Sequence, residues 1–226
     1  MPLSLAKTPP ATEEELLARA GSLAGRSVGE LATKAQVRIP RQMRRAKGLA
    51  GQLLELFLGA DAGSKAEPDF RGLGVELKTL PVHGGRPKES TFVCTIDLDR
   101  LGDTDFEASV VWHKLRRVLW IPIEADPSVE LPRRRFGAPI LWSPDPDQRR
   151  TLQDDYERIA VLVLRGRIDE LTGHLGDALQ VRPKAAHGGV RERAPEGIGG
   201  GYRWTGPRGF YLRPSFTAGI LERAFD

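Results

Sequence analysis

Asp69-Phe70-Arg71-Gly72-Leu73-Gly74-Val75-Glu76-Leu77-Lys78 is the stretch on which the fold depends, and it reads as an acidic residue, a glycine-bearing turn and a short strand. Side chains alternate between the two faces of a strand, so Glu76 and Lys78 are predicted to share one face. Val75 and Leu77 are then expected to point into the core. The stretch therefore combines a buried apolar face with a charged one.

Asp69 precedes the turn and is expected to fold back beside Glu76, so that two carboxylates and the ammonium of Lys78 converge. Such a group suits a divalent metal held by oxygen ligands next to a water molecule. The spacing is the D-x6-E-x-K form of a metal-dependent nuclease signature. Asp, Glu and Lys are common residues, however, and an amphipathic edge strand with a solvated Glu/Lys face gives the same pattern.

A third carboxylate, Glu55, lies in a stretch from 48 to 58 that is apolar nearly all round and is predicted to form a buried helix. A buried carboxylate must be paired, hydrogen-bonded or bound to metal. Glu55 is thus either a further member of the acidic site or a structural group. In the second case it pairs with a cation such as Lys47 or lies exposed on a narrow polar stripe.

The composition is that of a globular protein with a mildly basic charge. The chain has 226 residues, a net charge of +4 and a pI of about 9.4, which permits an anionic partner. A single cysteine, Cys94, excludes an intrachain disulfide and is consistent with a reducing compartment. No run approaches membrane-spanning length, so a cytoplasmic protein with no membrane partner is expected.

Periodicity and turn residues predict an α/β fold, with helices around a mixed sheet. Capping-box patterns at Thr12 and Ser27 begin the first two helices, and Ser215 is expected to cap the last. A turn-rich loop over 81–87 and a mobile glycine-rich loop over 186–201 are also expected. The predicted helices cover 12–23, a short stretch after 27, 48–58, 145–164 and 216–225; the predicted strands cover 75–80, 91–96, 118–123, 138–142, 179–182 and 208–212.

Several motifs in chain order carry a resemblance that covers nearly the whole sequence. They are Lys47-Gly48, Leu54-Glu55, Gly59-Ala60, Ala62-Gly63-Ser64-Lys65, Asp69-Phe70, Leu73–Thr79, Thr91-Phe92-Val93-Cys94, His113-Lys114-Leu115, Arg117–Pro122, Leu141-Trp142-Ser143-Pro144, Arg182–Ala186 and Pro207–Leu212. In these motifs the chain resembles the MutH family, the strand-nicking endonucleases of methyl-directed mismatch repair. The segment 187–205 departs from the family pattern.

The resemblance implies a restriction-endonuclease-like fold, a mixed sheet flanked by helices in two lobes around a DNA-binding cleft. One bilobed domain over 1–226 is expected, with the metal site in about 1–105 and most DNA-recognition loops in about 106–226. The implied activity is Mg2+-dependent nicking, with Mn2+ as a substitute, of the unmethylated strand at hemimethylated or unmethylated GATC. Activation by MutL, after MutS has found a mismatch, is implied as well. A monomer is expected in the absence of DNA.

The resemblance also assigns the catalytic residues. Asp69 and Glu76 match the metal-binding carboxylates, Glu55 matches a further acidic residue, and Lys78 matches the catalytic lysine. The backbone carbonyl of Leu77, between the two motif side chains, is expected to be another metal ligand. Lys78 is expected to orient the attacking water and to stabilise the charge of the transition state.

The expected DNA-binding residues lie mostly in the second half of the chain. Lys47 and Lys114 match family lysines near the active centre or the DNA, and the segment with Arg182, Pro183, Lys184 and Tyr211 matches the part that reads DNA. Lys184 is expected to donate to guanine acceptors in the major groove, and Arg182 to do the same or to hold a phosphate.

Two aromatic residues allow more than one interpretation. Tyr211 matches the residue that meets the target adenine, but on its own it reads as a core tyrosine on an apolar strand. Phe92 is expected to be a core residue or to touch a DNA base. At the level of function, a GATC-specific restriction endonuclease and a non-catalytic module that binds DNA or MutL remain as alternatives. The intact acidic and lysine positions argue against the second.

Overall fold

The computed structural model describes residues 3–40, 48–63, 67–184 and 189–225. They form two compact units. The first unit is Met1–Lys88 with Arg116–Ser143, and the second unit is Glu89–Leu115 with Pro144–Asp226. The chain therefore passes from one unit to the other three times. The expected assignment of functional lobes to about 1–105 and 106–226 stays a prediction.

The helices of the first unit begin where the sequence predicts. The Thr12 side chain accepts a hydrogen bond from the Glu15 backbone, and Ser27 forms a complete capping box with Glu30. Gly48 begins the third helix with a positive φ of 89°. These elements are α1 (Glu13–Gly21), α2 (Val28–Lys34), α4 (Leu49–Leu58) and the short 3-10 helix η3 (Leu131–Arg133).

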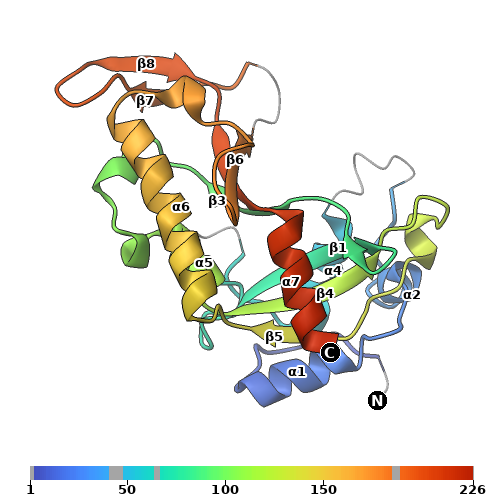
Figure 1. Ribbon diagram of the computed structural model, residues 1–226. Helices are drawn as coiled ribbons and strands as arrows, with labels where there is room; N and C mark the ends of the chain where they lie inside the picture. Colours follow the sequence, from blue (N-terminus) through green and yellow to red (C-terminus); the bar gives the residue numbers. More distant parts are fainter. Residues whose placement is uncertain (1–2, 41–47, 64–66, 185–188, 226) are drawn as a thin grey trace. The chain divides into compact units, whose positions relative to one another are not determined.

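The sheet of the first unit is mixed, as predicted. Its order is β2-β1-β4-β5, with β1 parallel to β4 and both outer strands antiparallel to their neighbours. Figure 1 shows β1 and β4 side by side through the middle of this unit. The strands are β1 (Glu76–His83), β2 (Arg86–Pro87), β4 (Val118–Glu124) and β5 (Ile140–Trp142).

The loop predicted over 81–87 is shorter than expected, because β1 continues through Pro81 to His83. The Pro81 carbonyl accepts a hydrogen bond from the Lys88 backbone at 2.9 Å, so the proline stays in the ladder although it has no N–H to donate. Gly84 and Gly85, with φ of 57° and 76°, make the two-residue turn into β2.

The core of the first unit packs α1, α2 and α4 against the sheet. Leu53, Leu54 and Leu58 of α4 lie in one buried cluster with Leu119 and Ile121 of β4. The prediction of a buried helix is confirmed for one side of α4 only, because Leu56 is 47% exposed and Glu55 is also exposed. One side of α4 therefore faces outward and carries the carboxylate.

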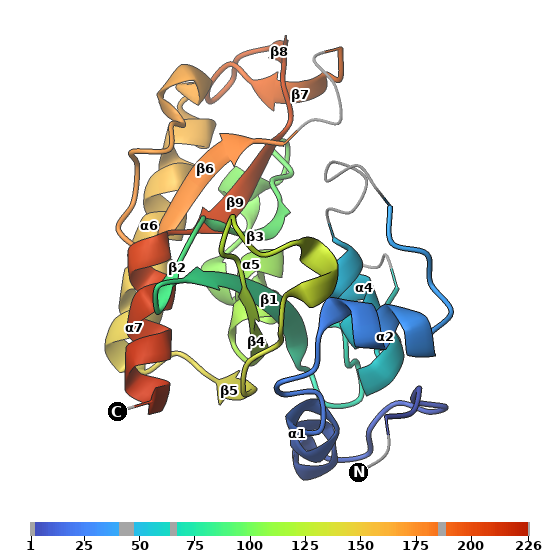
Figure 2. The ribbon, with the colours of Figure 1, turned by 90° about the vertical axis from the view of Figure 1, so that its right-hand side faces the viewer.

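The second unit contains a three-stranded antiparallel sheet, β3-β9-β6, and a separate two-stranded hairpin, β7-β8. The long helix α6 runs beside β6, as Figures 1 and 2 show from two directions. The strands are β3 (Thr91–Thr95), β6 (Leu179–Pro183), β7 (Glu192–Pro195), β8 (Tyr202–Thr205) and β9 (Arg208–Leu212).

The helices of the second unit differ from the prediction at two points. A short helix, α5, precedes β4 where no helix was predicted. The last helix begins at Pro214, so Ser215 lies inside its first turn and does not cap it. The helices are η1 (Leu101–Asp103), η2 (Phe106–Ala108), α5 (Val110–Leu115), α6 (Pro146–Leu164), η4 (Ile168–Glu170) and α7 (Pro214–Phe225). In the described part of the chain, no helix has the length and apolar character needed to cross a membrane.

The glycine-rich segment over 186–201 is not wholly a loop, which corrects the sequence prediction. Glu192–Pro195 form β7 and pair with β8, in the register Arg193 to Trp204 and Pro195 to Tyr202. The glycines gather at the turn of this hairpin, where Gly197 and Gly199 have positive φ. Residues 185–188 of the expected loop lie outside the described residues.

Candidate active site

The turn before β1 brings Asp69 back against the strand. The Phe70 backbone donates to the Val75 carbonyl at 2.9 Å, and both side chains are buried, so they hold the two ends of the turn together. Asp69 Oδ2 accepts a hydrogen bond from the Leu77 backbone at 2.8 Å. Asp69 therefore lies beside the first residues of β1, as the sequence predicts.

Glu76 and Lys78 form an ion pair on one face of β1. Lys78 Nζ lies 2.9 Å from Glu76 Oε1, and the side chains are only 9% and 5% exposed. The alternative of a solvated Glu/Lys face is wrong, because a solvated pair would be far more exposed. A buried charge is costly unless it is paired, so these two residues depend on each other.

Glu55 is electrostatically connected to the same group. Burial raises the pKa of the Glu55 carboxyl, and repulsion from Asp69 and then from Glu76 raises it further. The side chain nevertheless reaches solvent from the outward side of α4. Glu55 is thus an exposed member of an acidic group. Lys47, its possible ion-pair partner, lies outside the described residues.

The donor types at this site fit a hard divalent cation, which prefers carboxylate and carbonyl oxygens. Within the described residues, no three His, Cys, Asp or Glu side chains are arranged closely enough to hold an ion. The Leu77 N–H and the Lys78 ammonium instead bind the carboxylates of Asp69 and Glu76. The repulsion that raises the pKa of Glu55 is the effect that a cation would relieve.

Four predicted DNA-binding residues form one cluster in the second unit. The ring of Tyr211 meets that of Phe92 edge-on at 5.3 Å, and the guanidinium of Arg182 lies 5.8 Å from the Tyr211 ring. The Lys184 ammonium lies 3.9 Å from the centre of the Phe92 ring. Two exposed cations therefore rest on two half-buried rings. Neither Tyr211 nor Phe92 is a fully enclosed core residue.

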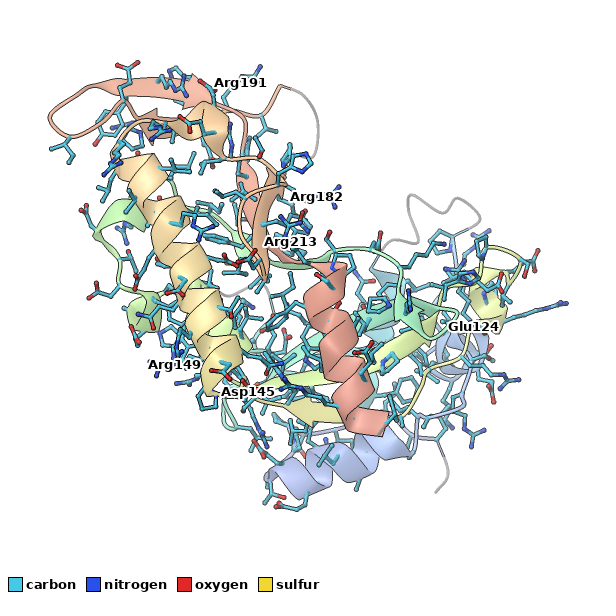
Figure 3. The ribbon with its side chains drawn as sticks, viewed as in Figure 1. Glu124, Asp145, Arg149, Arg182, Arg191 and Arg213 are labelled. Carbon is cyan, nitrogen blue, oxygen red and sulfur yellow. The ribbon has the colours of Figure 1, made fainter. Side chains whose placement is uncertain are left out.

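Backbone pairing explains why this cluster forms. Tyr211 on β9 lies between Gln180 of β6 and Phe92 of β3. A Cβ at Gly209 would come within 2.9 Å of the Phe92 ring, so the glycine leaves room for it. Figure 3 shows Arg182 at the end of β6. Pro183 is exposed beside Arg182. Lys114 is half-buried on α5, in the same unit but outside the cluster.

Two residues that the sequence interpretation overlooked hold the segment leading into β6. Asp155 of α6 is 2% exposed, and its carboxylate accepts from the backbones of Asp177, Ala178 and Leu179 at 2.7–2.9 Å. Arg213, which follows β9, donates to the carbonyls of Gly176 and Gly173 at 2.8 and 2.9 Å.

Asp155 had a readable signal in the sequence. It lies three residues after Leu152 and next to Tyr156, among the apolar residues that recur at helical spacing in α6, and a carboxylate there requires donors. Arg213 had none, because its partners are carbonyls whose position depends on the tertiary fold. Figure 3 shows Arg213 where β9 leads into α7.

Comparison with known proteins gives a consistent result. A family model described as the DNA mismatch repair enzyme MutH matches residues 58–155. The DNA mismatch repair protein MutH of Klebsiella pneumoniae strain 342 is 50% identical over 219 residues, which are 96% of this chain and 94% of that protein. Its namesake in Escherichia coli O17:K52:H18 is 48% identical over 96% of this chain and 95% of its own. The MutH protein of Shewanella sp. strain W3-18-1 is 46% identical over 96% of this chain and 97% of its own length.

Proposed function

The chain belongs to the MutH family of methyl-directed mismatch repair endonucleases, and on that premise we propose that it nicks the unmethylated strand at hemimethylated or unmethylated GATC. The family implies a restriction-endonuclease-like fold, and the two-lobed, DNA-binding form of that fold is part of the proposal. The observation that carries the proposal is the buried Glu76–Lys78 pair, which lies on the same strand that Asp69 contacts.

We assign the metal site to the side chains of Asp69, Glu76 and Glu55 and to the backbone carbonyl of Leu77. Mg2+, or Mn2+ in its place, would lower the pKa of a bound water and offset the negative charge of the phosphate. The acidic residues supply the oxygen donors that either ion prefers. The repulsion raising the pKa of Glu55 supports its membership of this group.

Lys78 is the positioning cation of the reaction in this proposal. Its ammonium is held in the site by Glu76, so little side-chain freedom remains to be lost when the substrate arrives. A fixed positive group near the phosphate orients the attacking water and stabilises the charge that develops in the transition state. A buried pair is suited to this role because water does not screen it.

The cluster on β6 and β9 supplies the recognition chemistry. Arg182 and Lys184 are exposed donors, and guanine presents two acceptors in the major groove. Tyr211 is assigned to the adenine N6 edge, where a methyl group would clash or block a hydrogen bond. Pro183 restrains the segment that carries both cations. The Phe92 ring supports the Lys184 ammonium from below.

The remaining members of the proposal are contacts outside this cluster. Lys47 and Lys114 are assigned to the DNA or to the neighbourhood of the active centre. MutL is the proposed activator, acting after MutS has found a mismatch, and the protein is proposed to be a cytoplasmic monomer in the absence of DNA. The relatives are named as DNA mismatch repair proteins, which supports these partners.

A plasmid assay tests the proposal. Supercoiled plasmid containing GATC is supplied unmethylated, hemimethylated or fully methylated, and is incubated with Mg2+ in the presence and absence of MutL. We expect MutL-stimulated nicking of the first two forms and none of the third. Rapid double-strand cutting without MutL would identify a restriction endonuclease instead, and no cutting under any condition would identify a binding module.

A further inference from the structure

The hairpin β7-β8 presents a face that the proposed recognition cluster does not use. The register pairs Arg193 with Trp204 and Pro195 with Tyr202, so these four side chains share one face. Trp204 and Tyr202 are 69% and 57% exposed. Exposed apolar side chains that lie together and are rimmed by polar residues mark an interaction site.

The opposite face anchors the hairpin to the rest of the second unit. Arg203 lies 2.9 Å from Asp169 of η4, and the Arg208 guanidinium donates to Thr205 Oγ1 at 2.7 Å. Ala194, between these contacts, is fully buried. The outward face is consequently held in a fixed orientation.

The backbone adds a second anchor at the turn of the hairpin. Gly166, just after α6, has a φ of 69°, and a Cβ there would meet the Glu196 carbonyl carbon at 2.4 Å. No other residue type fits at this distance without moving the chain. The hairpin is therefore packed at both its base and its turn.

The charge of the outward face favours a polyanion. Arg191 and Arg193 both lie on exposed positions, and none of the outward positions 191, 193, 195, 202 and 204 is acidic. The Arg193 guanidinium lies 3.9 Å from the centre of the Tyr202 ring, which leaves its edge free to bind phosphate. Arginines interleaved with aromatic rings on a β-ribbon are typical of nucleic-acid surfaces.

The hairpin also continues directly from the recognition segment. The Lys184 backbone donates to the Pro207 carbonyl at 2.8 Å, one step beyond the pairing of Pro183 with Arg208. Figure 3 shows Arg191 at the hairpin and Arg182 on the strand that leads towards it. The outward residues of β8 lie three to five positions from Pro207, which corresponds to at most about 10–17 Å.

We propose that the face formed by Arg191, Arg193, Tyr202 and Trp204 binds the sugar-phosphate backbone of duplex DNA outside the GATC site. The inference rests on the proposed function, because the distance to the hairpin face is counted from the residues assigned to GATC. At a rise of about 3.4 Å per base pair, the contact falls roughly 3–5 base pairs into the flanking DNA. Its role is affinity and alignment, since phosphate contacts carry no sequence information.

The test compares two duplexes with one central GATC. The long duplex has flanks of one helical turn, about 10 base pairs, and the short one has flanks of about 2 base pairs. Affinity is measured by fluorescence anisotropy at several salt concentrations, with the full chain. Arg191→Ala with Arg193→Ala should weaken binding of the long duplex several-fold and lower the salt slope by about 2. Binding of the short duplex should not change.

Two further variants distinguish the effect of the hairpin arginines from that of aromatic stacking and from that of the overall positive charge of the unit. Trp204→Ala should weaken binding of the long duplex without changing the salt slope, because the indole carries no charge. Arg150→Ala with Arg223→Ala removes two exposed arginines at the N-terminal end of α6, the end opposite Gly166 and the hairpin, and should change neither measurement.

Unchanged affinity and salt slope on the long duplex would overturn the inference, and so would equal losses on both duplexes. If the double variant kept DNA binding but lost MutL-stimulated nicking, the face would belong to a protein partner and the inference would also fail. Wild-type nicking is measured alongside. A wild-type protein that binds flanks through the hairpin but never nicks would leave this inference intact and contradict the proposed activity.

Discussion

The acidic strand β1 and the recognition strands β6 and β9 differ in the burial of their charged side chains. Glu76 and Lys78 are buried and neutralise each other. Arg182 and Lys184 are exposed and rest on aromatic rings. The first arrangement couples function to stability, because each charge is buried with the other. The second leaves the cations available to a ligand, so changes there should alter binding and spare the fold.

Lys78→Ala is the strongest test of this difference. Nicking should fall at least about 100-fold, because a positioned charge in the site is lost. The free energy of unfolding should also fall by about 3 kcal/mol, because Glu76 stays buried without its partner. Single-turnover nicking and urea denaturation measure the two effects.

DNA affinity of the same variant serves as the control and should remain near the wild-type value. If Lys78→Ala instead lost DNA binding while the chain stayed folded, Lys78 would belong to the binding surface and the contrast would break. Lys78→Met keeps the apolar stem and separates loss of charge from loss of packing.

The second unit also contains a buried charge, Asp155, and Asp155→Ala should show that the stability of the unit depends on it. Three backbone N–H groups lose their acceptor, and the stability loss should be about 3 kcal/mol. Asp155→Asn retains one oxygen and should lose less. Affinity for GATC duplex should fall in the same order, because the segment before β6 loosens, whereas unchanged stability would show that the carboxylate is dispensable.

Tyr211→Phe should have a smaller effect that is confined to discrimination. The ring remains to pack on Phe92, and only the hydroxyl is removed. The ratio of nicking rates on unmethylated and fully methylated GATC should fall by up to about 10-fold, the value of one hydrogen bond. Rates on unmethylated DNA should change little. Equal losses on both substrates would count against methyl sensing by Tyr211.

Glu55→Gln should give the smallest effect, a gain in stability without metal. The pKa of Glu55 is raised in the folded state, so the protonated form is favoured there, and stability is lost as pH rises through that pKa. Removing the charge should therefore raise the melting temperature at pH 7 but not at pH values below the carboxyl's unfolded pKa.

With added Mg2+ at pH 7, the wild-type chain should instead have the higher melting temperature of the two. The reason is that it retains the charge of Glu55 as a ligand for the cation. Thermal unfolding in chelator and in Mg2+ provides the comparison. Lower stability of Glu55→Gln in chelator would show that no repulsion exists to be relieved.

Local signals predicted the helices of the first unit and the central strands well. Capping at Thr12 and Ser27 and the alternation in β1 depend on residues close in sequence, so they can be read without the fold. The burial of Glu76 and the exposure of Leu56 could not be read in this way, because both depend on what packs against β1 and α4.

The hairpin β7-β8 and the hydrogen bonds of Asp155 show the same limit in the second unit. Each strand of the hairpin has four residues, too few for a clear alternation, and four glycines lie between the two strands. The roles of Arg182, Lys184 and Tyr211 came from the family resemblance, and the structure adds that they form one cluster with Phe92. The acidic motif became specific only together with these distant residues.

Strand mapping on a hemimethylated duplex tests the central claim most directly. The duplex contains one GATC, carries a different label on each strand and is incubated with the protein, Mg2+ and MutL. We predict a cut only in the unmethylated strand, with Lys78→Ala cutting neither strand. Cuts in both strands, or in the methylated strand, would contradict the assignment of cutting to β1 and of strand choice to β6 and β9.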